Sequence, residues 1–174
     1  LSQVHYHQND DKKGDHYFFL FEQEAPYNVY GNFDTHRKLS KSFFEQGKYT
    51  EAEAAIHALS DWWQENKGHC PFEIQIYELL STAEIAEARG DKSMAETRRL
   101  RANGLAQIVL DDKSTTEGVL FFIAKVLEEF DDFPTAVQYY KRILRSEASN
   151  PMMVQKIGGQ FLAMGEHKLA EELF

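Results

Sequence analysis

The amino-acid sequence predicts an all-α protein built from antiparallel helical hairpins that stack as repeats. Three observations lead to this prediction: a 34-residue periodicity late in the chain, turn-forming residues between helix-favouring stretches, and small residues at fixed distances from each turn. A period between roughly 20 and 50 residues is typical of solenoids, in which each unit buries its apolar face only against neighbouring units. With 174 residues, 43% of them apolar, the chain is long enough to bury a continuous core.

Residues 1–32 differ from the rest of the chain and are predicted to cover the open end of the first repeat. The polar run Gln8–Asp15 leads into Tyr17–Phe21, a short aromatic stretch that periodicity assigns neither to a strand nor to a helix. We expect an irregular, extended or partly helical lid, because the terminal hairpin of a solenoid otherwise exposes apolar surface. Residues 33–174 are expected to form about four hairpins, the last one incomplete.

Glycines mark three of the four predicted hairpin turns. Gly47, Gly90 and Gly165 can adopt the left-handed conformation that closes a helix without a Cβ clash. Around the second of them, residues 77–102 contain no proline and many strong helix formers, which favours two helices interrupted at Arg89–Asp91. The connectors between hairpins are expected at Lys67–Pro71, Asp111–Thr116 and Asn150–Pro151.

The third turn has a different composition, Asp131-Asp132-Phe133-Pro134. An aspartate here can cap the following helix, and Pro134 lies near the first turn of that helix, where a missing N–H costs nothing. Small residues flank all four turns and would let the paired helices approach closely. They are Ser40, Ala83, Ala124 and Gly158 in the first helices, opposite Ala52, Ala95, Ala136 and Ala170 in the second helices.

Residues 34 positions apart share the same type: large and apolar, small, turn-forming, or packed in the loop after the turn. The positions Leu120, Ile123, Ala124, Leu127, Asp131, Phe133, Ala136 and Tyr140 recur as Val154, Ile157, Gly158, Phe161, Gly165, His167, Ala170 and Phe174. This spacing resembles the tetratricopeptide repeat, and so does the first turn, Gly47-Lys48-Tyr49-Thr50-Glu51-Ala52. The resemblance covers about residues 33–174 and implies a right-handed superhelical stack of hairpins. Because successive turns are 43, 41 and 34 residues apart, the first two repeats must have longer helices or loops than the family norm.

Composition excludes several classes of protein. The formal net charge of −9 argues against a general nucleic-acid or anionic-membrane surface, because neutralising phosphates requires a concentrated basic field. No run of 18 apolar residues is present, so no transmembrane helix is predicted. The single cysteine, Cys70, excludes an internal disulfide and leaves the compartment open. The location is therefore unknown from the sequence, with the cytoplasm favoured. A chain that begins with Leu1 and ends at Phe174, within a predicted helix, is expected to be an excised domain or a processed product.

The sequence contains no convincing active site or metal site. The pattern His5-x-His7 and its acidic neighbours hold metal-ligand types, but a solvated tail is preferred because the spacing matches no established metal site. His69 beside Cys70 is interpreted as an ordinary loop thiol with a neighbour, since a catalytic pair normally comes from distant segments. No phosphate-binding loop or nucleophile elbow is present. We therefore predict a non-enzymatic protein with no catalytic residues, no cofactor and no metal.

The tetratricopeptide resemblance implies which side chains would line the concave groove of the stack. Basic side chains in the first repeat and aromatic ones in the third would receive an acidic peptide, with the cations steering it and the aromatic rings anchoring it. Ordinary solvent-facing helix positions are the alternative interpretation. The implied groove residues are Arg37, Lys38, Lys41, Tyr77, Ser81, Glu84, Phe121, Phe122, Lys125, Gln155 and Lys156.

The leading functional hypothesis is a scaffold or adaptor that binds a peptide or a protein surface in this groove. A second hypothesis is self-association, in which the open C-terminal hairpin and the aromatic N-terminal segment complete each other between chains. A third is a sensory or regulatory domain of a larger signalling or transcription-regulatory protein. None of the three requires membrane insertion or direct binding to nucleic acid.

Overall fold

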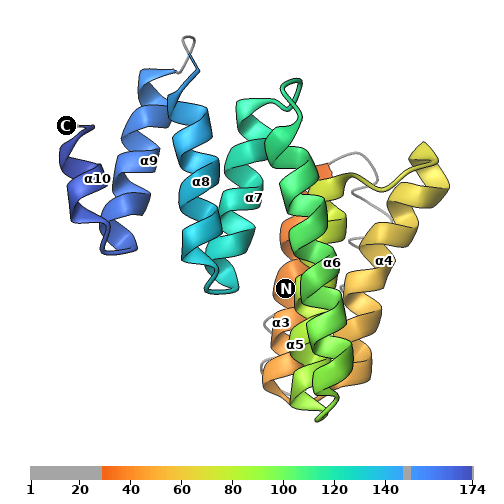
Figure 1. Cartoon of the computed structure of the whole chain (residues 1–174). Helices are drawn as coiled ribbons and strands as arrows, with labels where there is room; N and C mark the ends of the chain where they lie inside the picture. The colour runs from red at the N-terminus through yellow and green to blue at the C-terminus, as the bar shows by residue number, and fades with distance from the viewer. Residues whose placement is uncertain (1–28, 147–149, 174) are drawn as a thin grey trace. The chain divides into compact units, whose positions relative to one another are not determined.

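The computed structural model describes residues 29–146 and 150–173, and every regular element within them is an α-helix (Figure 1). This confirms the prediction of an all-α protein for the described part of the chain. The predicted N-terminal lid lies outside these residues, except that positions 29–32 belong to the first helix. The described helices are α3 (Val29–Glu45), α4 (Tyr49–Lys67), α5 (Phe72–Ala88), α6 (Lys92–Asp111), α7 (Glu117–Glu129), α8 (Phe133–Leu144), α9 (Pro151–Ala163) and α10 (His167–Glu171).

The helices pair into hairpins, α3/α4, α5/α6, α7/α8 and α9/α10, and one left-handed residue closes each of them. Gly47, Gly90 and Gly165 have φ angles of 72°, 87° and 78°. The third hairpin uses Asp131 at φ 59°, and aspartate is among the few non-glycine residues that occasionally adopt this conformation. All four turns therefore lie where the sequence predicts them.

Each turn repeats the same pair of backbone hydrogen bonds. At the second turn, the N–H of Gly90 donates to the carbonyl of Glu87 at 2.9 Å, and the N–H of Asp91 donates to the carbonyl of Ala86 at 2.8 Å. Equivalent pairs, with the same residue spacing, close the other three turns. This arrangement is the Schellman motif, which satisfies carbonyls at a helix end that have no partner within the helix.

Small residues are spaced identically around the four turns. The small residue of the first helix precedes the left-handed residue by seven positions, and an alanine follows it by five. The N–H of that alanine donates the first backbone hydrogen bond of the second helix. In α6, for example, the N–H of Ala95 donates to the carbonyl of Asp91 at 3.1 Å. Ala83, Ala86 and Ala95 form one buried cluster, which confirms the predicted contact of small residues between α5 and α6.

Side-chain caps begin the later helices. The Asp132 carboxylate accepts a hydrogen bond from the N–H of Thr135 at 3.3 Å, and the Asn150 side chain accepts one from the N–H of Met152 at 2.9 Å. A proline occupies the first turn of both α8 and α9. Capped N–H groups of this kind stabilise a helix by about 1 kcal/mol each, so local chemistry determines where these helices start.

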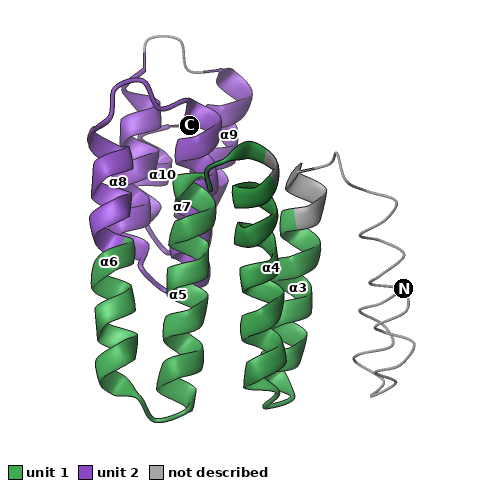
Figure 2. Cartoon of the chain, turned by 90° about the vertical axis from the view of Figure 1, so that its right-hand side faces the viewer, with its two compact units in different colours: residues 1–102 green, residues 103–174 purple. Residues whose placement is uncertain are grey.

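The chain divides into two compact units, residues 1–102 and residues 103–174, with the boundary inside α6 (Figure 2). The first part of α6 belongs to the first unit and its remainder belongs to the second. That residues 33–174 form one repeat domain stays a prediction.

In the first unit, α3 packs against α4 and α4 packs against α5. The Phe33 and Tyr77 rings meet edge to face with their centroids 4.9 Å apart, which joins α3 to α5. The Arg98 guanidinium donates to the Glu53 carboxylate at 3.3 Å and to the carbonyl of Thr82 at 2.7 Å. One arginine on α6 thus connects α4 with α5.

In the second unit, α7 packs against α8 and α9 packs against α10. Tyr139, Tyr140 and Phe161 are each less than 2% exposed and are the largest fully buried side chains. The Tyr139 hydroxyl donates to the carbonyl of Ala106 at 2.5 Å, and the Tyr140 hydroxyl donates to Glu128 at 2.6 Å. Because both hydroxyls have acceptors, burying these rings gains apolar contact without leaving a polar group unsatisfied.

We predict opposite effects of two glycine-to-alanine substitutions. Gly90→Ala places a Cβ on a residue with φ 87° and should lower the free energy of unfolding by about 1–2 kcal/mol. Gly104→Ala lies within α6, where the new Cβ meets no atom within 4 Å, and should raise it by about 0.5–1 kcal/mol. Urea denaturation followed by circular dichroism measures both changes. A Gly90→Ala variant as stable as the wild-type chain would show that the left-handed turn imposes no cost on alanine.

Stability should decrease below about pH 6.5 because of His36. The side chain is 6% exposed, and its Nδ1 donates to the carbonyl of Ala55 at 2.9 Å. Burial lowers the pKa of His36 below its usual 6.5, although the bond to Ala55 opposes this change. The unfolded chain therefore binds more protons, so this contribution is complete above the unfolded-state pKa and is lost as the pH falls through the folded-state pKa.

Urea denaturation at about pH 7.5 and at about pH 5.5 checks the role of His36. The loss of stability between the two conditions should be smaller for His36→Gln than for the wild-type chain. An equal loss in both proteins would assign the pH dependence to other groups.

Candidate functional site

Helices α7 and α9, the first helices of the last two hairpins, carry five of the predicted binding residues. Lys125 Nζ on α7 donates to Gln160 Oε1 on α9 at 2.6 Å, so the two helices lie next to each other. We call the surface of these two helices that carries the five residues the α7/α9 face. The five residues are Phe121, Phe122, Lys125, Gln155 and Lys156. Of its members, Phe121 and Phe122 are half-buried, whereas Lys125, Gln155 and Lys156 are exposed.

A buried tyrosine of α8 supports the α7/α9 face from the interior. The centroid of the Tyr140 ring lies 5.6 Å from that of Phe121 and 5.8 Å from that of Phe161. Burial and the adjacent Glu128 carboxylate raise the pKa of Tyr140, so its hydroxyl stays protonated and continues to donate to Glu128. Ring packing and hydrogen bonds therefore join α7, α8 and α9 beneath this surface.

The positive charge of Lys125 is compensated within the chain. Its Nζ forms an ion pair with Glu128 Oε2, three residues further along α7, and also donates to Gln160. The Glu128 side chain is only 11% exposed, so solvent and salt screen this pair less than a fully exposed one. Any external carboxylate would have to compete with Glu128 for Lys125, so Lys156 is the more accessible cation of the face.

Two of the three predicted cations of the first unit are also paired. Asp34 accepts a hydrogen bond from Arg37 at 3.0 Å, and its other oxygen lies 2.5 Å from Lys38 Nζ. Partial burial acts to raise the pKa of Asp34, but the hydrogen bonds and charges of Lys38 and Arg37 outweigh it and lower the pKa. Lys41 is exposed. The chain's own carboxylates therefore neutralise much of the predicted basic strip.

Two predicted groove residues, Tyr77 and Ser81, lie in the interior of the first unit. Tyr77 is 4% exposed and packs against Phe33, and Ser81 is 7% exposed. Their helix, α5, contacts both α4 and α6, so it is buried on more than one side. The expected register came from a shorter family repeat, whereas α5 has 17 residues. Neither side chain offers surface to a partner in this structure.

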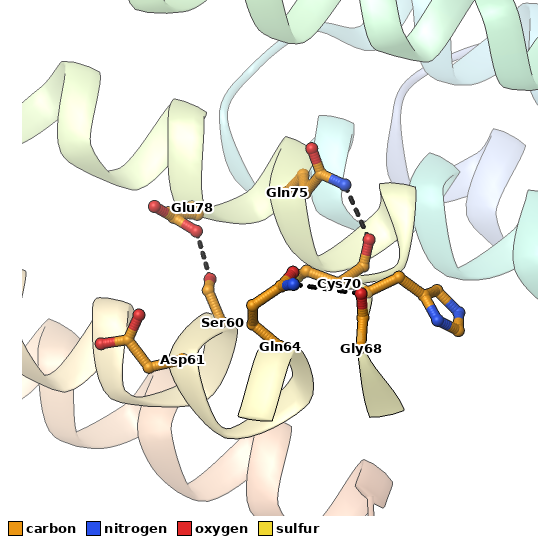
Figure 3. A pocket seen from close by; sticks show the side chains of 8 residues that line it. Ser60, Asp61, Gln64, Gly68, Cys70, Gln75 and Glu78 are labelled. Atoms are coloured by element: carbon orange, nitrogen blue, oxygen red, sulfur yellow. Dashed lines mark hydrogen bonds between the residues drawn. The ribbon is translucent and has the colours of Figure 1, made fainter. Parts of the chain in front are cut away.

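A cavity of about 410 Å³, which no sequence pattern indicated, lies between α4 and α5 in the first unit (Figure 3). One Glu78 oxygen accepts from the Ser60 hydroxyl, and the other lies 2.9 Å from His57 Nδ1. Gln75 Nε2 donates to the carbonyl of Cys70 at 2.7 Å. Because two helices and their connector contribute to this cavity, no contiguous motif marks it. Its lining residues are Ser60, Asp61, Gln64, Gly68, His69, Cys70, Gln75 and Glu78.

This cavity does not pair Cys70 with His69 as a nucleophile with its base. The Cys70 sulfur lies 3.8 Å from the carbonyl of Pro71, whereas His69 Nδ1 lies 3.1 Å from the carbonyl of Lys67. Burial raises the pKa of Cys70 to about 11, and the nearby Glu78 carboxylate acts in the same direction. The thiol is therefore protonated near neutral pH, in agreement with its interpretation as an ordinary thiol.

The Cys70 thiol should react slowly with iodoacetamide in the folded protein. Its pKa rises from 9.0 to about 11, which lowers the thiolate fraction near neutral pH about 100-fold. We expect alkylation at about pH 7.5 to be about 100-fold slower in the folded chain than in the chain unfolded by urea, as followed by mass spectrometry. Equal rates in the two states would contradict the half-buried, protonated thiol.

The described residues include no group of three or more histidine, cysteine, aspartate or glutamate side chains that could hold a metal ion. The sequence candidates His5 and His7 lie outside the described residues. None of the described helices combines the length and the apolar character needed to cross a membrane. Comparison with protein-family models, with curated proteins and with solved structures finds no match to this chain.

Proposed function

We propose that this chain is a helical repeat module of the tetratricopeptide type that binds a protein partner and acts as a scaffold or adaptor, not as an enzyme. Four hairpins with one turn geometry and one spacing of small residues support the proposal. Repeats of this kind stack in register and present their first helices along one surface. A right-handed superhelical arrangement of the four hairpins is part of what we propose.

The observation that carries the proposal is the α7/α9 face, which combines partly exposed aromatic rings with a fixed support. Phe121 and Phe122 are adjacent on α7, and aromatic side chains are enriched at the centres of protein interfaces. The Tyr140 ring and the hydrogen bond between Lys125 and Gln160 hold the helices together without a partner. A preorganised surface loses little conformational freedom on binding, which favours affinity.

The partner that suits this surface is a peptide or protein segment with an apolar residue beside acidic residues. The apolar side chain would contact Phe121 and Phe122, and a carboxylate would meet Lys156. Lys125 would contribute by exchanging Glu128 for a partner carboxylate, while Glu128 would keep its hydrogen bond from Tyr140. Affinity would come from aromatic burial, and selectivity would come from the position of the cations.

Self-association is a second candidate function, favoured by the apolar side chains that α9 exposes. Met152 is 61% exposed and Leu162 is 49% exposed. The helix paired with α9, α10, has only five residues. Two copies of the last hairpin would bury these side chains against each other and so remove them from water.

Truncating an aromatic residue of the α7/α9 face should weaken partner binding. Peptides selected from a displayed random library on the full chain provide the ligands, and isothermal titration calorimetry measures their affinities. Phe122→Ala should reduce affinity by about 10- to 30-fold, because loss of an aromatic anchor costs about 1.4–2 kcal/mol.

Phe133→Ala is the matched control for this experiment, since Phe133 is 39% exposed at the start of α8 and lies outside the α7/α9 face. The affinity of the Phe133→Ala variant for the selected peptides should stay within about twofold of the wild-type value. A folded Phe122→Ala variant with wild-type affinity would remove this face from the proposal. Sedimentation of the peptide-free protein at the same concentrations tests self-association. That second function predicts dimers in the absence of peptide.

A further inference from the structure

A polar pocket of about 380 Å³ lies in the second unit, between the C-terminal parts of α6 and α8. We call it the α6/α8 pocket. The contributing positions are spaced by three or four residues on each helix, so each helix turns one face toward the pocket. The lining residues are Gln107, Leu110 and Asp111 of α6 and Gln138, Lys141, Arg142 and Arg145 of α8 and its C-cap.

Hydrogen bonds between α6 and α8 hold the walls of this pocket in place. The Arg142 guanidinium donates to the carbonyl of Val109 at 2.8 Å and also to the carbonyls of Leu110 and Asp112. The carbonyls of Val109 and Leu110 lie in the last turn of α6, where no N–H of the helix itself is available to them, and Asp112 directly follows the helix. With the bond from Tyr139 to the carbonyl of Ala106, they place α8 against α6 and preform the pocket.

The pocket is basic although the chain carries a net charge of −9. Lys141, Arg142 and Arg145 line the pocket with one carboxylate, that of Asp111, which accepts a hydrogen bond from Gln107 at 3.0 Å. The Asp112 carboxylate, which does not line the pocket, interacts with the charge of Arg142. Within the described part of the chain, no carboxylate forms an ion pair with Lys141 or Arg145, and both side chains are exposed. Their charges are therefore available to a ligand, unlike those of Arg37, Lys38 and Lys125.

We propose that the α6/α8 pocket binds the carboxylates of an acidic peptide segment. This site is separate from the α7/α9 face and does not depend on it. Lys141 and Arg145 are four residues apart on one helix face, a rise of about 6 Å. Carboxylates two residues apart on one side of an extended peptide are separated by about 6.6 Å, so two of them match the two cations.

The chemistry of the lining groups fits this ligand. Arg145 can form two parallel hydrogen bonds to one carboxylate, and the Lys141 ammonium provides a point charge for the second. The exposed amide of Gln138 adds a neutral donor, and the half-buried Leu110 offers apolar contact to the stem of a glutamate side chain. Remote carboxylates of the chain are screened at about 0.1 M salt, where charges act over about 10 Å.

The last-turn position of Lys141 also stabilises α8, because cations favour the negative end of a helix. That effect needs only positive charge near the helix end. Recognition of carboxylates also requires the facing wall of α6, so Asp111 distinguishes the two roles. Replacing Asp111 removes a repulsive charge from the pocket and leaves the charges of α8 unchanged.

Fluorescence anisotropy of a labelled hexaglutamate peptide with the full chain tests the proposal, with hexaglutamine as the neutral comparison. Lys141→Ser/Arg145→Ser should weaken hexaglutamate binding at least about tenfold, because two charge-assisted contacts are lost. Asp111→Asn should strengthen it about threefold. Circular dichroism confirms that each variant is folded.

Arg101→Ser/Lys168→Ser is the control with the same change in net charge, since both side chains are exposed and lie outside the pocket. It should bind hexaglutamate within about twofold of wild type. Equal weakening by the control and pocket variants would overturn the proposal in favour of non-specific attraction. Wild-type protein that binds inorganic phosphate but not hexaglutamate would overturn it in favour of a phosphate site.

Discussion

The fold depends on one constraint that is repeated four times: a left-handed residue must close each first helix, and the second helix must begin two positions after it. Two backbone hydrogen bonds close the turn, and the residue after the left-handed one already accepts the first bond of the new helix. The chain therefore returns at a defined angle and brings a buried alanine against a small residue of the first helix, as Ala95 meets Ala83. A larger side chain at either position would push the helices apart, so turn geometry and residue size depend on each other.

This constraint determines what the second unit can present to a partner. With α7 and α8 held at their turn, the buried Tyr140 ring contacts both Phe121 and Phe161, and its hydroxyl positions Glu128. Glu128 in turn holds Lys125, which reaches across to α9. The α7/α9 face is thus a rigid aromatic surface whose nearest cation is internally paired. The more available cations lie on α8, where the guanidinium of Arg142 is committed to the end of α6 while Lys141 and Arg145 are not.

Much of the fold could be predicted because its signals act within a few residues. A glycine in the left-handed conformation, a capping aspartate and a proline in the first turn each influence only their own neighbourhood, and the turns at Gly90 and Asp131 lie where these residues occur. Pairing of Asp34 with Arg37 and Lys38 follows from the same short spacing. The interior positions of Tyr77 and Ser81 could not be predicted, because burial of α5 depends on α4 and α6 together. Both cavities escaped sequence analysis for a similar reason, since each is lined by two helices.

The equal spacing around the turns also shows where the chain can change length. From the small residue of the first helix to the alanine of the second, each hairpin spans thirteen residues, although successive turns are 43, 41 and 34 residues apart. All of the variation lies in the ends of the helices far from the turn and in the connectors that follow. Evolution or design can therefore insert or delete residues at those distal ends without disturbing a crossing, whereas one residue added inside the thirteen would rotate the alanine about 100° away from its partner.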